Sequence, residues 1–148
     1  MDTLPNFIEK MQKGRICLGT VVSFTDPTVS EALCSLLDFI WIDAEHGPFS
    51  LETIQGHVMA TKGTDTTPLV RVPGNDPIWI KQVLDLGAAG VIVPMIRTVE
   101  EARLAIAACL YPPAGVRGYG PRRHFQYGDF GGPQFCQETN DSTHRRLK

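Results

Sequence analysis

The sequence has no long hydrophobic run and no excess of charge of either sign. Its longest apolar stretches, such as residues 39–42, are far shorter than the roughly 20 residues that a membrane-spanning helix needs. Fourteen basic and sixteen acidic side chains leave a net charge of -2 over 148 residues. This balance creates no field that would attract nucleic acid or an anionic lipid surface. We therefore expect neither a nucleic-acid partner nor a membrane partner.

The sequence also lacks a basic and apolar leader at its start, and it has no C-x-x-C pair. Because the four cysteines are widely spaced, no two of them have a spacing that chelates a metal. We expect four reduced thiols in a cytoplasmic protein. Residues 22–25, where the first predicted strand ends, contain no glycine, so the G-x-G-x-x-G pattern of dinucleotide-binding folds is absent.

What the sequence does contain is a strand pattern followed by a helix pattern, repeated four times. The predicted strands are residues 16–24, 39–42, 68–72 and 91–93. Asp26-Pro27 and Asp76-Pro77 each combine an N-cap residue with a proline at the first helical position. The helix that Asp26-Pro27 opens is expected to run through Leu37. Thr98 and Glu101 form a capping box for the helix after the fourth strand. Strand starts separated by roughly 22 to 29 residues indicate consecutive βα units and a parallel sheet.

Such units suit an open doubly wound sheet or a (β/α)₈ barrel, and the missing glycine motif favours the barrel. A barrel needs eight units and this chain supplies four. We therefore predict an α/β fold of the TIM-barrel type in which only the first four βα units, a half barrel, are present. Glycine and proline between residues 128 and 133 break the pattern. Residues 1–130 would form the N-terminal half of a barrel domain, and residues 131–148 a divergent polar tail.

Polar residues follow the predicted strands at the place where barrel enzymes carry their chemistry. His46 is a candidate general base, because imidazole titrates near neutral pH without assistance. Asp43 and Glu45 are candidates to orient His46 or to receive its charge. The alternative is a solvated loop histidine flanked by acids.

Arg71 stands in an otherwise apolar strand, where a guanidinium needs an anionic partner. Its fork suits a substrate carboxylate and the adjacent enolate oxygen. The alternative is a structural salt bridge to Asp43 or Asp76. Asp85 lies among leucines near the end of a helix, which argues against a purely surface role. The alternative is a polar residue near the helix C-cap before Gly87, where a negative charge is slightly unfavourable.

Five motifs occur together and in order, namely residues 42–48 (IDAEHGP), 70–77 (VRVPGNDP), 80–87 (IKQVLDLG), 93–95 (VPM) and 111–118 (YPPAGVRG). Over about residues 10–130 the chain resembles the HpcH/HpaI aldolase/citrate lyase family. It is most similar to the class II branch that cleaves 4-hydroxy-2-oxo and 2-oxo-3-deoxy acids to pyruvate and an aldehyde.

The resemblance implies a (β/α)₈ barrel, a 2-oxo acid substrate and a divalent metal (Mg²⁺, Mn²⁺ or Co²⁺) acting as a Lewis acid. By the same resemblance, His46 is the catalytic base and Arg71 stabilises the enolate charge. Asp85 corresponds to the acid that raises the basicity of the histidine, often across a subunit contact, which implies a homo-oligomer. Asp43 and Glu45 remain supporting residues.

The family's metal ligands are a glutamate in a Gln-x-Glu-Thr motif on the fifth strand and an aspartate after the sixth strand, and neither segment occurs in this chain. Gln137-Glu138-Thr139 resembles the first motif only superficially, and we expect Glu138 to be a surface residue. We therefore predict an aldolase that is incomplete in this chain. The alternatives are a non-catalytic half barrel that associates with itself or a partner, and a citrate-lyase-type subunit acting on an acyl-CoA thioester.

Overall fold

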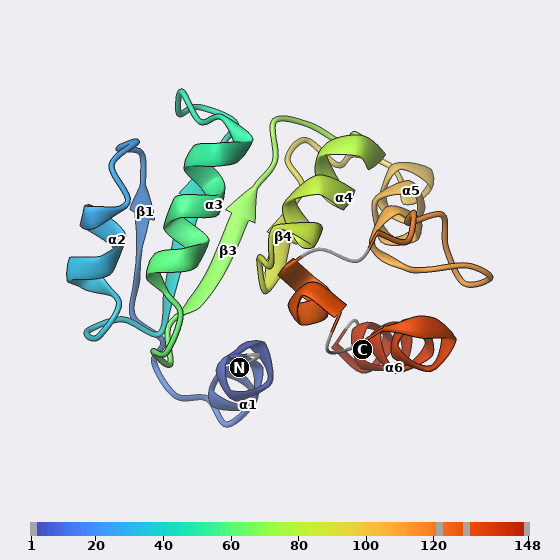
Figure 1. The fold of residues 1–148 in the computed structure, drawn as a ribbon, viewed down its shortest axis with the longest axis horizontal. Coiled ribbons are helices and arrows are strands. Elements are labelled where there is room, and N and C mark those ends of the chain that lie inside the picture. Colours follow the sequence, from blue (N-terminus) through green and yellow to red (C-terminus); the bar gives the residue numbers. More distant parts are fainter. Residues whose placement is uncertain (1–2, 121–122, 129–130, 147–148) are drawn as a thin grey trace.

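A computed structural model describes residues 3–120, 123–128 and 131–146 of the chain. Within these ranges four parallel strands form one sheet in the order β1-β2-β3-β4, and a helix follows each strand (Figure 1). The strands are β1 (Gly19–Val22), β2 (Phe39–Asp43), β3 (Thr67–Arg71) and β4 (Gly90–Ile92). The helices that follow them are α2 (Thr28–Leu33), α3 (Leu51–Ala60), α4 (Pro77–Asp85) and α5 (Val99–Cys109). The predicted alternation of parallel strands and helices is confirmed.

The starts of α4 and α5 follow the capping chemistry that the sequence predicts, whereas α2 begins one residue later than predicted, with Pro27 as its N-cap residue and the Asp26 carboxylate accepting the Thr28 N–H at 2.9 Å. The Asp76 carboxylate accepts the Ile78 backbone N–H at 2.8 Å, directly before α4. Thr98 and Glu101 form the complete capping box of α5. These caps satisfy backbone donors that have no partner inside the helix, so they fix where each helix begins after its strand.

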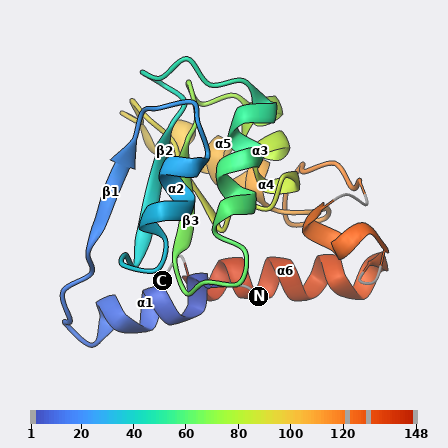
Figure 2. The same ribbon diagram turned by 60° about the vertical axis from the view of Figure 1, so that its left-hand side comes forward.

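The two faces of the sheet differ in their cover. Val22, Ile42 and Val70 lie in register on one face and are fully buried, in a core that the helices complete with residues such as Ile54 and Val83. Figure 2 shows α2 and α3 lying over this side of the strands. Because side chains alternate along a strand, Val21, Trp41 and Leu69 align on the opposite face. Val21 is 55% exposed there, so this second face is only partly covered by the described residues.

Two predicted elements are shorter in the structure. The strand predicted over residues 16–24 pairs only over Gly19–Val22, because β1 has its one neighbour in β2. The helix predicted through Leu37 ends at Leu33. A tertiary contact favours this early end, since the Thr66 hydroxyl donates to the carbonyl groups of Cys34 and Leu37 and holds the segment after α2 against the start of β3.

A helix that the sequence analysis did not predict, α1 (Leu4–Gln12), precedes the sheet. Lys10 pairs with Asp38 at 2.5 Å, and the rings of Phe7 and Phe39 lie 5.3 Å apart. Both contacts attach α1 to the start of β2. Proline at residue 5, in the first turn, is the sequence signal that could have located this helix.

The predicted polar tail forms a helix, α6 (Gly132–Arg146), after a short 3₁₀ helix, η1 (Arg123–Gly128). Both views place α1 and α6 at the end of the sheet where the strands begin (Figures 1 and 2). The Asn140 side chain accepts the Tyr111 N–H at 2.8 Å and donates to the Tyr111 carbonyl at 2.9 Å. These two bonds attach α6 to the segment that follows α5. Glu138 is exposed, as predicted. The predicted domain boundary at residue 130 lies outside the described residues and stays a prediction.

All four cysteines are free thiols. Among the residues that the structure describes, no helix combines the length and the hydropathy needed to cross a bilayer.

Candidate active site

The candidate site lies where β2 and β3 end. Asp43 and Arg71 are the last residues of these strands and face one another in the register of the sheet. Arg71 Nε donates to Asp43 Oδ1 at 2.9 Å, and Arg71 Nη2 donates to Asp43 Oδ2. Glu45 Oε2 lies 3.1 Å from Arg71 Nη1. The structural salt bridge to Asp43, one of the two alternatives for Arg71, is therefore present, whereas Asp76 caps α4 instead.

Asp43 also organises the loop that carries His46. Its Oδ1 accepts the backbone N–H groups of Glu45 and His46 at 3.1 and 3.2 Å. The Gly47 N–H closes this turn on the Asp43 carbonyl at 2.9 Å. A Cβ at Gly47 would lie 2.6 Å from that carbonyl oxygen and 2.3 Å from the Phe49 ring, so the turn requires glycine. One carboxylate thus fixes both Arg71 and the loop of the candidate base.

The charges of this cluster shift the pKa values of its members. The Arg71 guanidinium lowers the pKa of the Asp43 carboxyl below its usual value, and the two backbone N–H groups add to this effect. Asp43 in turn raises the pKa of Arg71. Two carboxylates therefore surround one guanidinium, and the cluster carries a net negative charge when His46 is neutral.

His46 is the accessible member of the cluster. Its side chain is 69% exposed, whereas those of Arg71 and Asp43 are 22% and 8% exposed. His46 Nε2 lies 3.6 Å from Glu45 Oε2, which places an acid beside the imidazole. The structure therefore brings together four of the five predicted residues: a solvent-facing histidine, a neighbouring acid and a fixed arginine–aspartate pair.

Asp85, the fifth predicted residue, lies elsewhere. Helix α4 begins after the carboxyl end of β3 and runs back to the amino end of β4, so Asp85 lies at the other end of the sheet from His46. Its carboxylate pairs with Lys81 at 2.7 Å and with Arg117 at 2.8 Å, and the Arg117 side chain is 2% exposed. Within this chain Asp85 is thus engaged in a buried ion pair, and its expected action on the histidine of a neighbouring subunit stays a prediction.

Sequence reasoning missed Trp41 and the partner of Asp85. The Trp41 ring lies under the Arg71 guanidinium, with Cζ 5.1 Å from the ring centroid. Trp41 belongs to an apolar run, and only its position two residues before Asp43 places it on the same face of the strand. Arg117 could be linked to Asp85 only through the tertiary fold, because 32 residues separate them in the sequence.

The described residues contain no group of three or more His, Cys, Asp or Glu side chains that could hold a metal ion. The nearest carboxylates, Asp43 and Glu45, both pair with Arg71. The residues described here therefore do not fit the divalent metal that the family resemblance implies.

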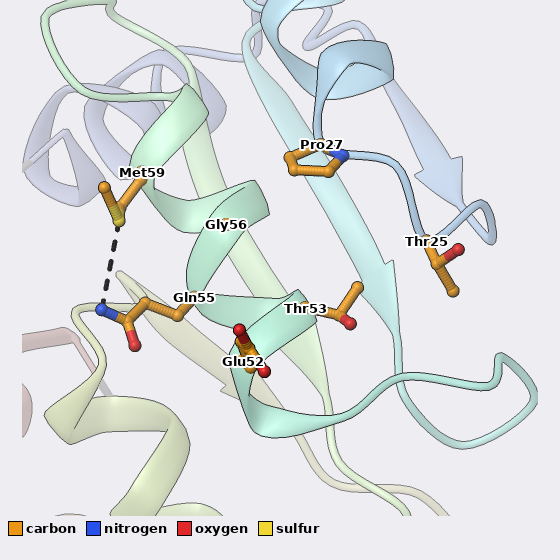
Figure 3. A pocket seen from close by; sticks show the side chains of 7 residues that line it. All are labelled: Thr25, Pro27, Glu52, Thr53, Gln55, Gly56 and Met59. Carbon is orange, nitrogen blue, oxygen red and sulfur yellow. Dashed lines mark hydrogen bonds between the residues drawn. The ribbon is translucent and has the colours of Figure 1, made fainter.

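A shallow pocket lies apart from this cluster, between the loop after β1 and the outer surface of α3 (Figure 3). Seven residues line it: Thr25, Pro27, Glu52, Thr53, Gln55, Gly56 and Met59. None of them belongs to the predicted site.

The chain spans about half the length of the relatives that it matches. It is 39% identical to the 4-hydroxy-2-oxovalerate aldolase of Novosphingobium aromaticivorans over 141 residues, which cover 91% of this chain and 52% of the relative. It is 38% identical to the 5-keto-4-deoxy-D-glucarate aldolase of Escherichia coli O9:H4 over 120 residues, covering 79% and 46% of the two chains.

Solved structures also match this chain over about half of their own length. The HpcH/HpaI aldolase of Desulfitobacterium hafniense superposes with a TM-score of 0.80 at 27% identity, over 90% of this chain and 52% of the other. Macrophomate synthase superposes with a TM-score of 0.74 at 27% identity, over 97% and 49%. The α/β arrangement of four parallel strands alternating with helices thus superposes on about half of each of these structures, which confirms the predicted fold class. The family model of the HpcH/HpaI aldolase/citrate lyases matches residues 21–144, and the chain therefore belongs to this family.

Proposed function

We propose that this chain supplies the base and the arginine of an aldolase that cleaves a 4-hydroxy-2-oxo or 2-oxo-3-deoxy acid to pyruvate and an aldehyde. The observation that carries the proposal is the cluster at the carboxyl ends of β2 and β3. There the exposed His46 lies beside Glu45, and Arg71 is held by Asp43. The names of the aldolase relatives agree with this chemistry.

The proposed cleavage assigns one proton and one charge to these residues. His46 takes the proton of the C4 hydroxyl, the C3–C4 bond breaks, and its electron pair moves through C2 to the oxygen of the former keto group. The aldehyde leaves, and the pyruvate enolate remains. The protonated His46 then returns a proton to C3, which gives pyruvate and restores the base.

Arg71 would stabilise the negative charge that develops on the enolate oxygen. A guanidinium has five N–H donors, and the contacts to Asp43 and Glu45 occupy three of them. Two donors therefore remain for an anionic substrate oxygen. Because the cluster is net negative, a free carboxylate substrate would also need positive charge from outside the described residues. The divalent metal that the family resemblance implies would have to be held by residues other than those that the structure describes.

A chimera tests the proposal. This chain would be joined to the part of the Novosphingobium relative that lies beyond the matched residues, and cleavage of 4-hydroxy-2-oxovalerate would be followed through pyruvate release with added Mn²⁺. We expect cleavage, and we expect His46→Asn and Arg71→Lys each to lower kcat about 100-fold or more, the usual contribution of a base or an oxyanion donor. Glu52→Gln, in the pocket on α3, is the matched control and should leave kcat unchanged.

A chimera with native circular dichroism that cleaves nothing would contradict the proposal. So would a chimera whose kcat is insensitive to His46→Asn. Should the fused chain fail to fold, the same part of the relative is supplied as a separate polypeptide together with this chain, and cleavage is measured on the mixture. Cleavage that Arg71→Lys leaves unchanged contradicts the assigned role of Arg71.

A further inference from the structure

Trp41 contacts the one guanidinium of the candidate site on its flat face. The Arg71 Cζ atom lies 5.1 Å from the centroid of the indole ring, within the roughly 6 Å at which a cation is attracted by an aromatic face. The sheet register creates this contact. Trp41 stands directly opposite Leu69, so Arg71 is its diagonal neighbour on the same face of the sheet.

The carboxylates and the ring restrain Arg71 in different ways. Asp43 and Glu45 contact the nitrogen atoms at the edge of the guanidinium, which fixes its position within its own plane. Contacts at the edge restrain motion within the plane more strongly than motion out of it. A ring against the flat face opposes motion out of the plane, so the carboxylates and the indole together restrain the orientation of the remaining N–H donors.

The indole N–H does not account for the position of the ring. Trp41 Nε1 is buried, and it has no hydrogen-bond partner among the residues that the structure describes. A buried donor without a partner is unfavourable, so the ring is held in place by its faces and not by its polar atom. A phenyl ring would keep an aromatic face and remove the unsatisfied donor. Phenylalanine is therefore the conservative replacement, whereas leucine removes the aromatic face.

We propose that Trp41 is a positioning residue, which holds the plane of Arg71 so that its two remaining N–H donors are presented to an anionic oxygen of the 2-oxo acid. The identity of that anion rests on the proposed function. The restraint of Arg71 by Trp41 does not, and it exists in the chain without any ligand.

The test uses the full 148-residue chain and the ¹⁵N-edited NMR signal of the Arg71 Nε–H. We expect Trp41→Leu to accelerate the hydrogen exchange of this N–H about tenfold. This factor corresponds to the loss of one partly desolvated cation–aromatic contact. Trp41→Phe should stay within about twofold of the unmodified chain for the same reason. Trp79→Phe, which changes the other tryptophan of the chain, should have no effect on this signal.

Fluorinated tryptophan keeps the measurement decisive even where Trp41→Leu unfolds the chain. In the Trp79→Phe background only Trp41 carries the label, and successive fluorines weaken the negative face of the ring with little change in its shape. We expect the exchange rate of the Arg71 Nε–H to rise with each added fluorine. An exchange rate that is independent of fluorination, or equal in Trp41→Leu and Trp41→Phe, overturns the proposal.

The same variants in the aldolase chimera separate this inference from the proposed function. We expect Trp41→Leu to lower kcat about tenfold, with Trp41→Phe close to the parent. A chimera without cleavage refutes the aldolase proposal and leaves the NMR result standing. If the chimera cleaves its substrate but the exchange rate of the Arg71 Nε–H does not change in the Trp41 variants, only the positioning role is refuted.

Discussion

At the scale of single residues, Asp43 is the centre of the candidate site. It accepts hydrogen bonds from the Arg71 side chain and from the backbone of Glu45 and His46, and its side chain is 8% exposed. The sequence motif made Asp43 only a supporting residue. The structure instead assigns it two separate structural tasks, because strand register puts it opposite Arg71 and turn geometry puts it under the loop of His46.

The lowered pKa of Asp43 predicts how its contribution depends on pH. Because the carboxyl is more acidic in the folded chain than in the unfolded chain, it stabilises the fold at pH values above the unfolded value of about 3.9. This stabilisation is lost as the pH falls through the lower pKa of the folded state. We expect Asp43→Asn to cost about 2 kcal/mol at pH 7, since it removes a charged hydrogen-bond pair.

Urea unfolding at pH 7, 5, 4 and 3 checks this prediction. The difference in free energy of unfolding between the parent and Asp43→Asn should shrink on acidification. Asp65→Asn, a change to an exposed acid, is the control and should follow the parent at each pH. A difference for Asp43→Asn that stays constant from pH 7 to pH 3 would contradict the assignment.

At the scale of elements, His57 joins α3 to its neighbours. It is fully buried, its Nδ1 lies 2.7 Å from Ser30 Oγ of α2, and its ring packs edge-on against Phe49. Burial lowers the pKa of His57, and the opposing effects of the Phe24 and Thr25 backbone and of the Asp26 charge are smaller. His57 therefore belongs to the packing between helices.

This burial predicts a second pH dependence. A buried histidine takes up a proton less readily in the folded chain than in the unfolded chain. Its full contribution to the free energy of unfolding is therefore present above the unfolded pKa of about 6.5. Stability then falls with pH until the lower folded pKa is reached. We expect a loss of about 1 kcal/mol per pH unit within this window, close to the limit for one titrating group.

The measurement is the free energy of unfolding between pH 7.5 and pH 5 for the parent, His57→Gln and the exposed control His46→Gln. The slope should be reduced in His57→Gln and retained in His46→Gln. Equal slopes in all three proteins would show that His57 is not the group responsible.

The elements also show which features the sequence can predict and which it cannot. Asp76 and Thr98 act on backbone groups within three residues, so their helix starts could be predicted from local chemistry. The segment after α2 is held by Thr66, 32 residues beyond Cys34, and the ion pair of Asp85 depends on Arg117. Partners that only the tertiary fold brings together have no local signal. For the same reason the sequence alone left both Asp43 and Asp76 as possible salt-bridge partners of Arg71.

At the scale of the whole molecule, β1 and β4 are the two outer strands of the sheet, each with one neighbour among the described residues. Large apolar side chains on and around β1 are strongly exposed, including Ile16 at 89%, Val21 at 55% and Phe24 at 67%. An outer strand with free backbone groups and apolar side chains is a template for pairing with another chain. The exposure of β1 therefore favours association of the 148-residue chain.

We expect this chain to self-associate through β1, and a lysine on that strand to oppose it. Val21→Lys should weaken association about tenfold or more, since it replaces a valine that association would bury with a charged side chain. Ile78→Lys is the matched control, because Ile78 is 65% exposed but lies on α4 and not on an outer strand. Sedimentation velocity over a concentration series measures both variants, with circular dichroism as a check on folding. Equal weakening by the two lysines would mean that general hydrophobicity drives association, and an unchanged Val21→Lys would exclude the β1 edge as the contact.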